Sequence, residues 1–278
     1  MSQAITSMPP LRDVIAQHDL RATKKLGQNF LLDLNLTDKI ARTAGNLSGI
    51  NVFEIGPGPG GLTRSILQNN PNHLTAIEFD KRAIAALQDL KNVTGDDIFT
   101  LIHGDALAQD LTKLSDAPRA IIANLPYNIA TPLLTGWLSQ IRRNQNAYQS
   151  MTLMFQREVA QRITAQVGDK AYGRLSVICQ WLCDVRLCFD VPASAFTPPP
   201  KITSSIVYFK PKTLNTDDPD FKSIEKITAA AFGQRRKMIR TSLKDYKEYF
   251  SAVGLDETLR AENIPPEKFI ELAKISNL

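Results

Sequence analysis

Three acidic residues stand at the ends of successive strand-like runs. They are Glu54 in the run 51–55, Glu78 in the run 73–79 and Asp105 in the run 98–106. The carboxyl ends of parallel strands meet at one edge of a sheet, where open α/β folds bind their ligands. A carboxylate there accepts hydrogen bonds from ribose hydroxyls or an amino group, or complements a positive charge. Any one of these acids alone could be a surface or helix-capping residue, but three in succession favour a ligand site.

A glycine-rich turn follows the first of these runs, and its spacing G-x-G-x-x-G is met by Gly56, Gly58 and Gly61. Such turns let the backbone approach a dinucleotide or S-adenosylmethionine, and a purely structural turn is a third reading. Pro57 and Pro59 lack the N–H groups that would hold a pyrophosphate at a helix N-terminus. Glu54 would repel a pyrophosphate and complement the ammonium and sulfonium groups of S-adenosylmethionine. The turn therefore favours S-adenosylmethionine.

A fourth strand-like run, "RAIIAN" (119–124), ends in Asn124-Leu125-Pro126-Tyr127. An amide, a rigid ring and an aromatic face come together where an ordinary buried strand would simply stop. Hydrogen-bonding and stacking groups are thus expected at the same edge of the sheet as the acids. We predict that this stretch is the catalytic site.

These residues need a sheet to position them, and the pattern supplies one. Strand-like and helix-like runs alternate from about residue 50, which indicates a βαβ series and a mostly parallel sheet. A fifth strand is expected at 151–156, and two more at 184–191 and 204–210. No helix-like segment separates the last two, so they are expected to pair as antiparallel neighbours. The prediction is an α/β sheet of seven strands that ends in an antiparallel strand.

A polar, proline-containing linker follows Pro211, and only helical patterns follow it. We place a boundary near residue 213, between a sheet domain (1–213) and an all-helical domain (214–278). The helical runs are "FKSIEKITAAAF", "RRKMIRTSL", "YKEYFSAVG" and "PPEKFIELAKI".

Composition narrows the class of protein. With 278 residues and 43% hydrophobic content, the chain can bury a sizeable core. It has no apolar run of the ~20 residues that a membrane-spanning helix needs, and its N-terminus lacks the layout of a secretory signal. Cys179, Cys183 and Cys188 are odd in number and are expected to be reduced, buried thiols rather than a metal site. We expect a cytoplasmic protein that binds no membrane and no metal.

The net charge of +5 is a modest bias toward polyanions. The densest positive cluster spans residues 233–244 and contains no acid. It is the best candidate for contacts to nucleic-acid phosphates, with a solvated helix face as the alternative. The residues predicted to bind RNA there are Arg235, Arg236, Lys237 and Arg240.

These residues lie within a longer series of motifs, which resembles that of the class I S-adenosylmethionine-dependent methyltransferases and, more narrowly, the KsgA family of ribosomal RNA adenine dimethyltransferases. The motifs are "LGQNFLLD", "VFEIGPGPGGLT", "AIEFD", "HGDA", "NLPYNI", "FTPPPKITSSIV" and "FGQRRKMIRTSL". The resemblance implies a Rossmann-like sheet of seven strands whose last strand is antiparallel. It also implies that Asn29 and Leu31 close over the cofactor, and that the other contacts include Gly56, Glu78, Asp105 and Asn124.

The resemblance further implies dimethylation of the amines of two adjacent adenosines near the end of small-subunit ribosomal RNA, on an immature 30S subunit. The adenine amine needs positioning more than a strong base. The Asn124 carbonyl and a neighbouring main-chain carbonyl would accept its N–H bonds, and Pro126 would stiffen that turn. Tyr127 would stack on an extruded base, and we predict that Phe196, held above the pocket by prolines, covers the other face. We expect a monomer.

Three other functions compete with this one. A resistance methyltransferase acting on large-subunit RNA shares the Asn-x-Pro-Tyr pattern, although Leu125 and "FGQRRK" favour the small-subunit enzyme. A role in binding alone, as in related mitochondrial transcription factors, is weaker because every predicted catalytic residue is present. An NAD-dependent dehydrogenase would use the glycine turn, against which the two loop prolines argue.

Overall fold

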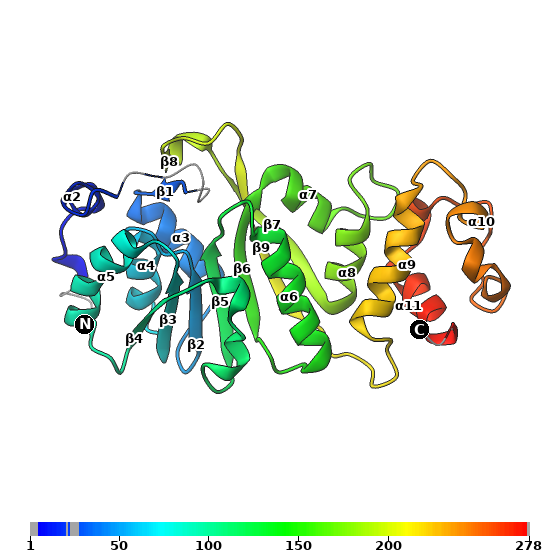
Figure 1. Ribbon diagram of the computed structural model, residues 1–278, viewed down its shortest axis with the longest axis horizontal. Helices are drawn as coiled ribbons and strands as arrows, with labels where there is room; N and C mark the ends of the chain where they lie inside the picture. The colour runs from blue at the N-terminus through cyan, green and yellow to red at the C-terminus, as the bar shows by residue number, and fades with distance from the viewer. Residues whose placement is uncertain (1–4, 21, 23–27, 277–278) are drawn as a thin grey trace. The chain divides into compact units, whose positions relative to one another are not determined.

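The computed structural model describes residues 5–20, 22 and 28–276, and its central element is a sheet of seven strands (Figure 1). In spatial order they are β4 (Phe99–His103), β3 (His73–Glu78), β2 (Asn51–Ile55), β5 (Arg119–Asn124), β6 (Ser150–Gln156), β9 (Ser204–Pro211) and β7 (Cys183–Val191). β4, β3, β2, β5 and β6 pair in parallel, while β9 runs antiparallel to β6. The predicted seven strands with an antiparallel last strand are confirmed. β9 lies between β6 and β7, so β7 is the edge strand.

The parallel strands form because their side chains are apolar on both faces of the sheet, as buried parallel sheets require. Phe53, Ile121 and Leu153 are fully buried in adjacent strands. Helix α4 (Gly61–Gln68) packs against β3 and β5, and α5 (Lys81–Thr94) packs against β3 and β4. The carboxyl ends of β2, β3, β4 and β5 therefore meet at one edge.

A second sheet has only two short strands, β1 (Phe30–Leu31) and β8 (Phe196–Thr197). They pair antiparallel, with Phe30 opposite Thr197 and Leu31 opposite Phe196. This pairing was not predicted, because a strand of two residues leaves no period in a sequence. It joins the segment before the main sheet to the proline-containing loop before β9.

The chain divides into two compact units. One comprises the chain up to Gly136 together with Asn146–Arg157 and Leu187–Phe209, and the other comprises Trp137–Gln145, Glu158–Arg186 and the chain from Lys210. Helices α7 (Arg157–Thr164) and α8 (Arg174–Leu182), which precede the predicted boundary at residue 213, thus fall almost entirely in the second unit. Within the second unit, Trp181 of α8 stacks on Phe221, with 6.5 Å between ring centroids.

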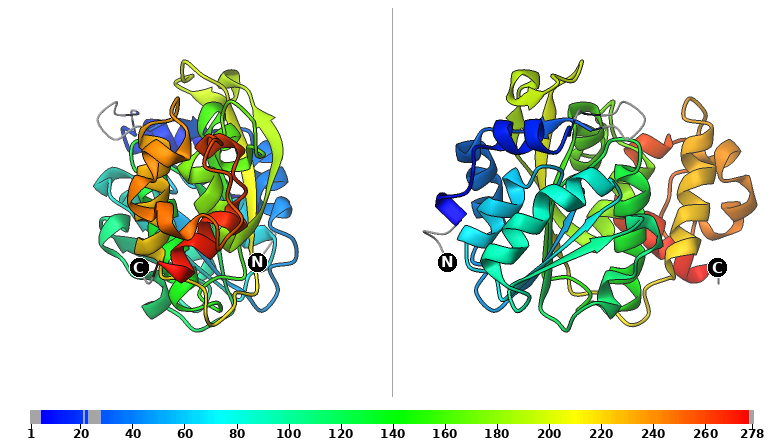
Figure 2. Two further views of the ribbon diagram at one scale, coloured as in Figure 1. Left: turned by 90° about the vertical axis from the view of Figure 1, so that its right-hand side faces the viewer. Right: turned by 60° about the vertical axis from the view of Figure 1, so that its left-hand side comes forward.

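The C-terminal segment is helical, as predicted. Two further views show α9 (Phe221–Gly233, yellow) beside α11 (Pro266–Ile275, red) (Figure 2). The predicted helix "RRKMIRTSL" was too long: α10 covers only Ile239–Ser242, because Met238 forms a β-bridge with Arg260. The predicted helix "YKEYFSAVG" is replaced by a shorter 3₁₀ helix, Lys244–Tyr249. No helix in the described ranges is long and apolar enough to cross a membrane.

Candidate functional site

A cavity lies at the carboxyl ends of β2, β3, β4 and β5, next to β1. It brings together eleven of the predicted site residues: Asn29, Leu31, Glu54, Gly56, Gly58, Glu78, Asp105, Asn124, Leu125, Pro126 and Tyr127. Residues that span almost a hundred positions of the chain thus line one site. Leu26 and Gly27, at the start of the first motif, lie outside the described residues.

The N–H groups of the glycine turn are already hydrogen-bonded within the protein. Gly56 donates to the Ile77 carbonyl (2.9 Å) and Gly60 to the Pro57 carbonyl (3.1 Å). Gly58 donates to Glu78 Oε2 at 3.1 Å. Pro57 and Pro59 have no N–H to offer. From residue 56 to residue 60 the loop therefore has no free donor for a phosphate group.

The segment that carries Asn29 packs directly on this turn. A Cβ atom at Gly58 would lie 3.0 Å from the Phe30 ring, and one at Gly61 would lie 2.7 Å from the Leu31 carbonyl oxygen. The absence of side chains at these two glycines allows the approach. Asn29 and Leu31 are thereby held at the mouth of the predicted cofactor site.

Glu54 is a buried carboxyl group that lines the cavity and is only 1% exposed. Its Oε2 has no hydrogen-bond partner among the residues that the structure describes. Burial raises the pKa of Glu54 to about 8, and the nearby Glu78 carboxylate adds to the rise. A buried acid with an unused oxygen suits a ligand that brings its own positive charge.

Glu78 is held by three backbone N–H groups. Besides Gly58, the N–H groups of Phe79 and Asp80 donate to its Oε1, both at 2.8 Å. Burial raises the pKa of Glu78, and these hydrogen bonds oppose the rise. The carboxyl group is thus fixed in place at the lining of the cavity, where it can accept hydrogen bonds from the hydroxyl groups of a ligand.

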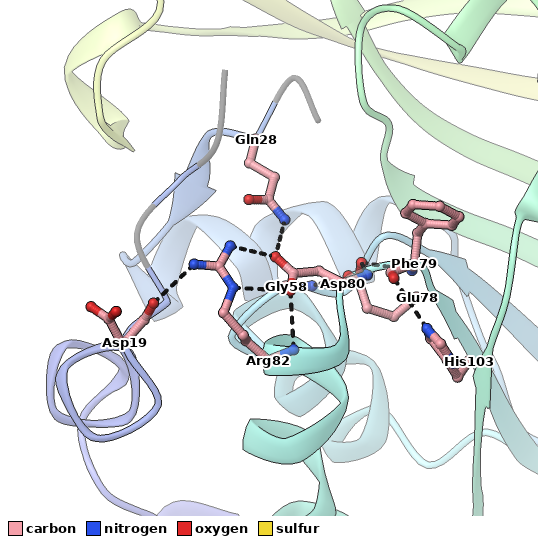
Figure 3. Close-up of polar contacts among 8 residues, drawn as sticks. All are labelled: Asp19, Gln28, Gly58, Glu78, Phe79, Asp80, Arg82 and His103. Carbon is pink, nitrogen blue, oxygen red and sulfur yellow. Dashed lines mark hydrogen bonds and ion pairs between the residues drawn. The ribbon is translucent and has the colours of Figure 1, made fainter. Parts of the chain in front are cut away.

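A network beside the cavity holds Gln28 (Figure 3). Gln28 Nε2 donates to Asp80 Oδ2 at 3.1 Å, and Arg82 donates to both oxygens of Asp80. The Arg82 guanidinium also donates to the Asp19 carbonyl at 3.0 Å. Its hydrogen bonds lower the pKa of Asp80 to about 2, so the network stays charged at any working pH.

Asp105 lines the cavity and also caps a helix. Its Oδ1 accepts from the N–H of Leu107 at 2.9 Å, at the start of a 3₁₀ helix (Ala106–Ala108). The capping alternative is therefore realised, and Oδ2 remains for a ligand.

Two exposed apolar side chains beside Asp105 were missed in the sequence. Phe79 is 62% exposed and Leu107 is 48% exposed, and both line the cavity. Large apolar groups exposed at a concave site suit a flat aromatic ligand. The position of Phe79 directly after the strand-end acid was the available signal.

The side-chain amide of Asn124 is oriented by the segment that covers it. Its Nδ2 donates to the Asn29 carbonyl at 3.3 Å, which leaves Oδ1 as the acceptor on the other side. The Pro126 carbonyl accepts from the N–H of Ile129 at 3.1 Å. The Pro126 carbonyl is thus engaged, and we take the carbonyl of Leu125, next to Asn124, as the candidate for a second acceptor.

Tyr127 is half-buried and lines the cavity. Its hydroxyl shares a 2.6 Å hydrogen bond with Ser204 Oγ. Burial raises the pKa of the phenol, so Tyr127 stays neutral and offers its ring rather than a charge.

Phe196 differs from the prediction. Its side chain is only 2% exposed, is packed in the core with Leu31 and Ile206, and is not among the residues that line the cavity. The prolines do not hold its ring above the pocket here, because β8 pairs with β1 and turns the ring inward. In this conformation Phe196 is a loop anchor, which was the alternative reading, and a stacking role would require β8 to move.

The predicted RNA-binding residues lie in the second unit. Arg235 donates to Glu262 (2.8 Å) and to the Lys170 carbonyl (2.5 Å). Arg240 lies 3.9 Å from Glu257. Arg236 and Lys237 are exposed. Arg236 and Lys237 are thus better candidates for phosphate contacts than Arg235.

Comparisons with known proteins agree on one family. A family model described as ribosomal RNA adenine dimethylase matches residues 19–278. The chain is 52% identical over 270 residues to ribosomal RNA small subunit methyltransferase A of Rhodospirillum rubrum, across 96% of this chain and 92% of that protein. It is 51% identical over 276 residues to the protein of the same name from Rhodopseudomonas palustris, across 97% and 95%.

Two solved structures are similar to this chain in fold. A dimethyladenosine transferase from Plasmodium falciparum is similar with a TM-score of 0.71 and 25% identity, over 86% of this chain and 94% of that one. The 23S rRNA methyltransferase ErmE shares the fold, with a TM-score of 0.67 and 22% identity over 90% of this chain and all of that one.

Proposed function

Because the chain belongs to the ribosomal RNA adenine dimethylase family, we propose that it dimethylates the N6 amines of two adjacent adenosines near the 3′ end of 16S ribosomal RNA. The enzyme is an S-adenosylmethionine-dependent ribosomal RNA adenine dimethyltransferase. Its substrate is the immature 30S subunit in the cytoplasm, and it acts as a monomer.

The orientation of Asn124 carries this proposal. The lone pair of an adenine amine is delocalised into the ring, so the amine needs correct placement rather than a strong base. Because Asn124 Nδ2 donates a hydrogen bond to the Asn29 carbonyl, Asn124 Oδ1 can accept one from an amine N–H. The Leu125 carbonyl accepts the other, and together they direct the lone pair out of the ring plane.

Tyr127 completes the base site. Tyr127 and Asn124 both line the cavity, and the phenol of Tyr127 stays neutral. An extruded base stacked on such a face gains ~1–3 kcal/mol. Tyr127 thus fixes the plane of the base, and Asn124 fixes the position of its amine.

S-adenosylmethionine supplies a methyl group made electrophilic by a sulfonium centre. The residues around the cavity suit it: Glu54 complements its positive charge, Glu78 accepts hydrogen bonds from its ribose hydroxyl groups, and Asp105 Oδ2 accepts one from its adenine amine. Asn29 and Leu31 cover it, and Gly56 and Gly58 let the backbone approach. NAD is disfavoured, because residues 56 to 60 of the glycine turn have no free N–H for a pyrophosphate.

We expect Phe79→Ala to weaken S-adenosylmethionine binding about 10-fold, because a stacking face for the adenine is lost. Titration calorimetry measures it. Leu114→Ala is the matched control, since Leu114 is 40% exposed and lies outside the lining of the cavity. If the two variants bind S-adenosylmethionine equally well, Phe79 does not contact the cofactor.

We expect Asp80→Ser to weaken cofactor binding about 5-fold, because serine still caps α5 but is too short to hold Gln28 and Arg82. The melting temperature should fall only slightly. Binding as tight as that of the wild type would show that Gln28 does not need this network.

The substrate is tested with labelled cofactor and separated ribosomal subunits. We expect label in the small-subunit RNA of immature particles. Label only in large-subunit RNA would instead assign the activity named for ErmE, and a protein that binds the subunit without labelling it would have a binding role alone. Arg236→Glu with Lys237→Glu should weaken subunit binding without changing cofactor affinity.

A further inference from the structure

We propose that Ser204 is a positioning residue for the base site, holding the ring of Tyr127 in the orientation that receives the target adenine. The inference rests on the proposed function. It assigns a role to a buried serine that lies 77 residues from Tyr127 along the chain and touches it through one hydrogen bond of 2.6 Å.

Ser204 is a fixed point. It is 0% exposed and is the first residue of β9, where it pairs with Gln156 of β6. The preceding Thr203 carbonyl accepts from the N–H of Arg157 at 3.0 Å. The hydroxyl therefore sits on a strand that is anchored on both sides of it.

Tyr127, in contrast, needs an anchor. It lies in the turn between β5 and α6 (Ala130–Arg143), and its ring is only half-buried. A ring held only at its Cα can rotate about two side-chain torsions. The hydrogen bond at the tip of the ring removes that freedom before the base binds. The entropy of the Tyr127 side chain is therefore lost during folding and not on binding.

The bond also defines what the hydroxyl does not do. With burial raising the pKa of Tyr127, the phenol remains protonated. A hydroxyl engaged with Ser204 is a tether, and the ring face is what remains for the substrate.

The neighbouring serine is a matched control. Ser205 is also 0% exposed, but it points to the opposite face of β9 and donates to Asp190 Oδ1 at 2.6 Å. Removing its hydroxyl deletes a comparable buried hydrogen bond without touching Tyr127.

The test compares Ser204→Ala, Tyr127→Phe, the double variant and Ser205→Ala in full-length protein, with immature small subunits as substrate. We expect each of the first two to lower kcat about 5-fold with KM for S-adenosylmethionine unchanged. The double variant should lose no more than either one, and Ser205→Ala should keep the wild-type kcat. Melting temperatures report folding.

A wild-type kcat for Tyr127→Phe, which keeps the ring, would overturn the proposal even if Ser204→Ala failed to fold. A double variant whose loss is the product of the single losses would also overturn it, since Ser204 would then act without the Tyr127 hydroxyl. Either result would leave the proposed function intact, whereas a wild-type protein that adds no methyl group to small-subunit adenosines would refute that function itself.

Discussion

Replacing Asn124 by alanine is expected to lower kcat for adenosine methylation by about 100-fold or more, because a misplaced acceptor amine loses its approach to the methyl group. Cofactor affinity should fall by less than about 10-fold, the most that one neutral hydrogen bond accounts for. Single-turnover methylation and titration calorimetry measure the two quantities separately.

Asn51→Ala is the control for this variant. Asn51 is the first residue of β2, so it lies at the amino end of that strand and away from the cavity. Its Nδ2 donates to the Asp116 carbonyl at 2.9 Å. Its loss removes a similar amide but should leave kcat unchanged. Equal losses in kcat and in cofactor affinity for Asn124→Ala would show that Asn124 binds the cofactor and does not orient the amine.

Replacing Glu54 by glutamine is expected to change how stability depends on pH. Burial raises the pKa of Glu54 from its ordinary value of 4.5 to about 8, so the folded state holds this proton up to about pH 8. The protonated carboxyl therefore stabilises the fold fully at low pH, and this contribution is lost as pH rises from about 4.5 to about 8, at ~1 kcal/mol per unit. The variant Glu54→Gln lacks this loss, so its advantage over the wild type should grow from pH 5 to pH 8.

Urea unfolding of the cofactor-free protein at several pH values measures this difference, with Glu158→Gln, an exposed glutamate on α7, as control. Cofactor binding should respond in the opposite sense. Wild-type affinity should rise from pH 6 to pH 8, because the carboxyl must lose its proton to complement the ammonium group. A parallel pH dependence of stability in Glu54→Gln and the wild type would contradict the assignment.

The sequence predicted the main sheet well because its signals are local. Runs such as "NVFEI" and "RAIIAN" are mostly apolar, and the missing helix between the last two strands indicated that the sheet ends with an antiparallel strand, which is β9 beside β6. Strand-end acids then predicted the edge at which the cavity lies. These inferences needed no long-range contact.

The parts that were missed or wrong depend on contacts between distant residues. β1 and β8 are too short for a period, yet their pairing turns Phe196 into the core instead of over the pocket. The partner of the Tyr127 hydroxyl, Ser204, lies in another strand and is visible only in the fold. The basic run 235–237 resembled the start of a helix, but the helix begins only at Ile239, after Met238 has formed a β-bridge with the distant Arg260.

The central claim is that this site places two methyl groups on the amine of each of two neighbouring adenosines. Immature small subunits incubated with the protein and S-adenosylmethionine can be digested and their adenosines weighed by mass spectrometry. We predict two adjacent N6,N6-dimethyladenosines in wild-type reactions and unmodified adenosines with Asn124→Ala. Full dimethylation by Asn124→Ala, or dimethyladenosine found only in large-subunit RNA, would contradict the account.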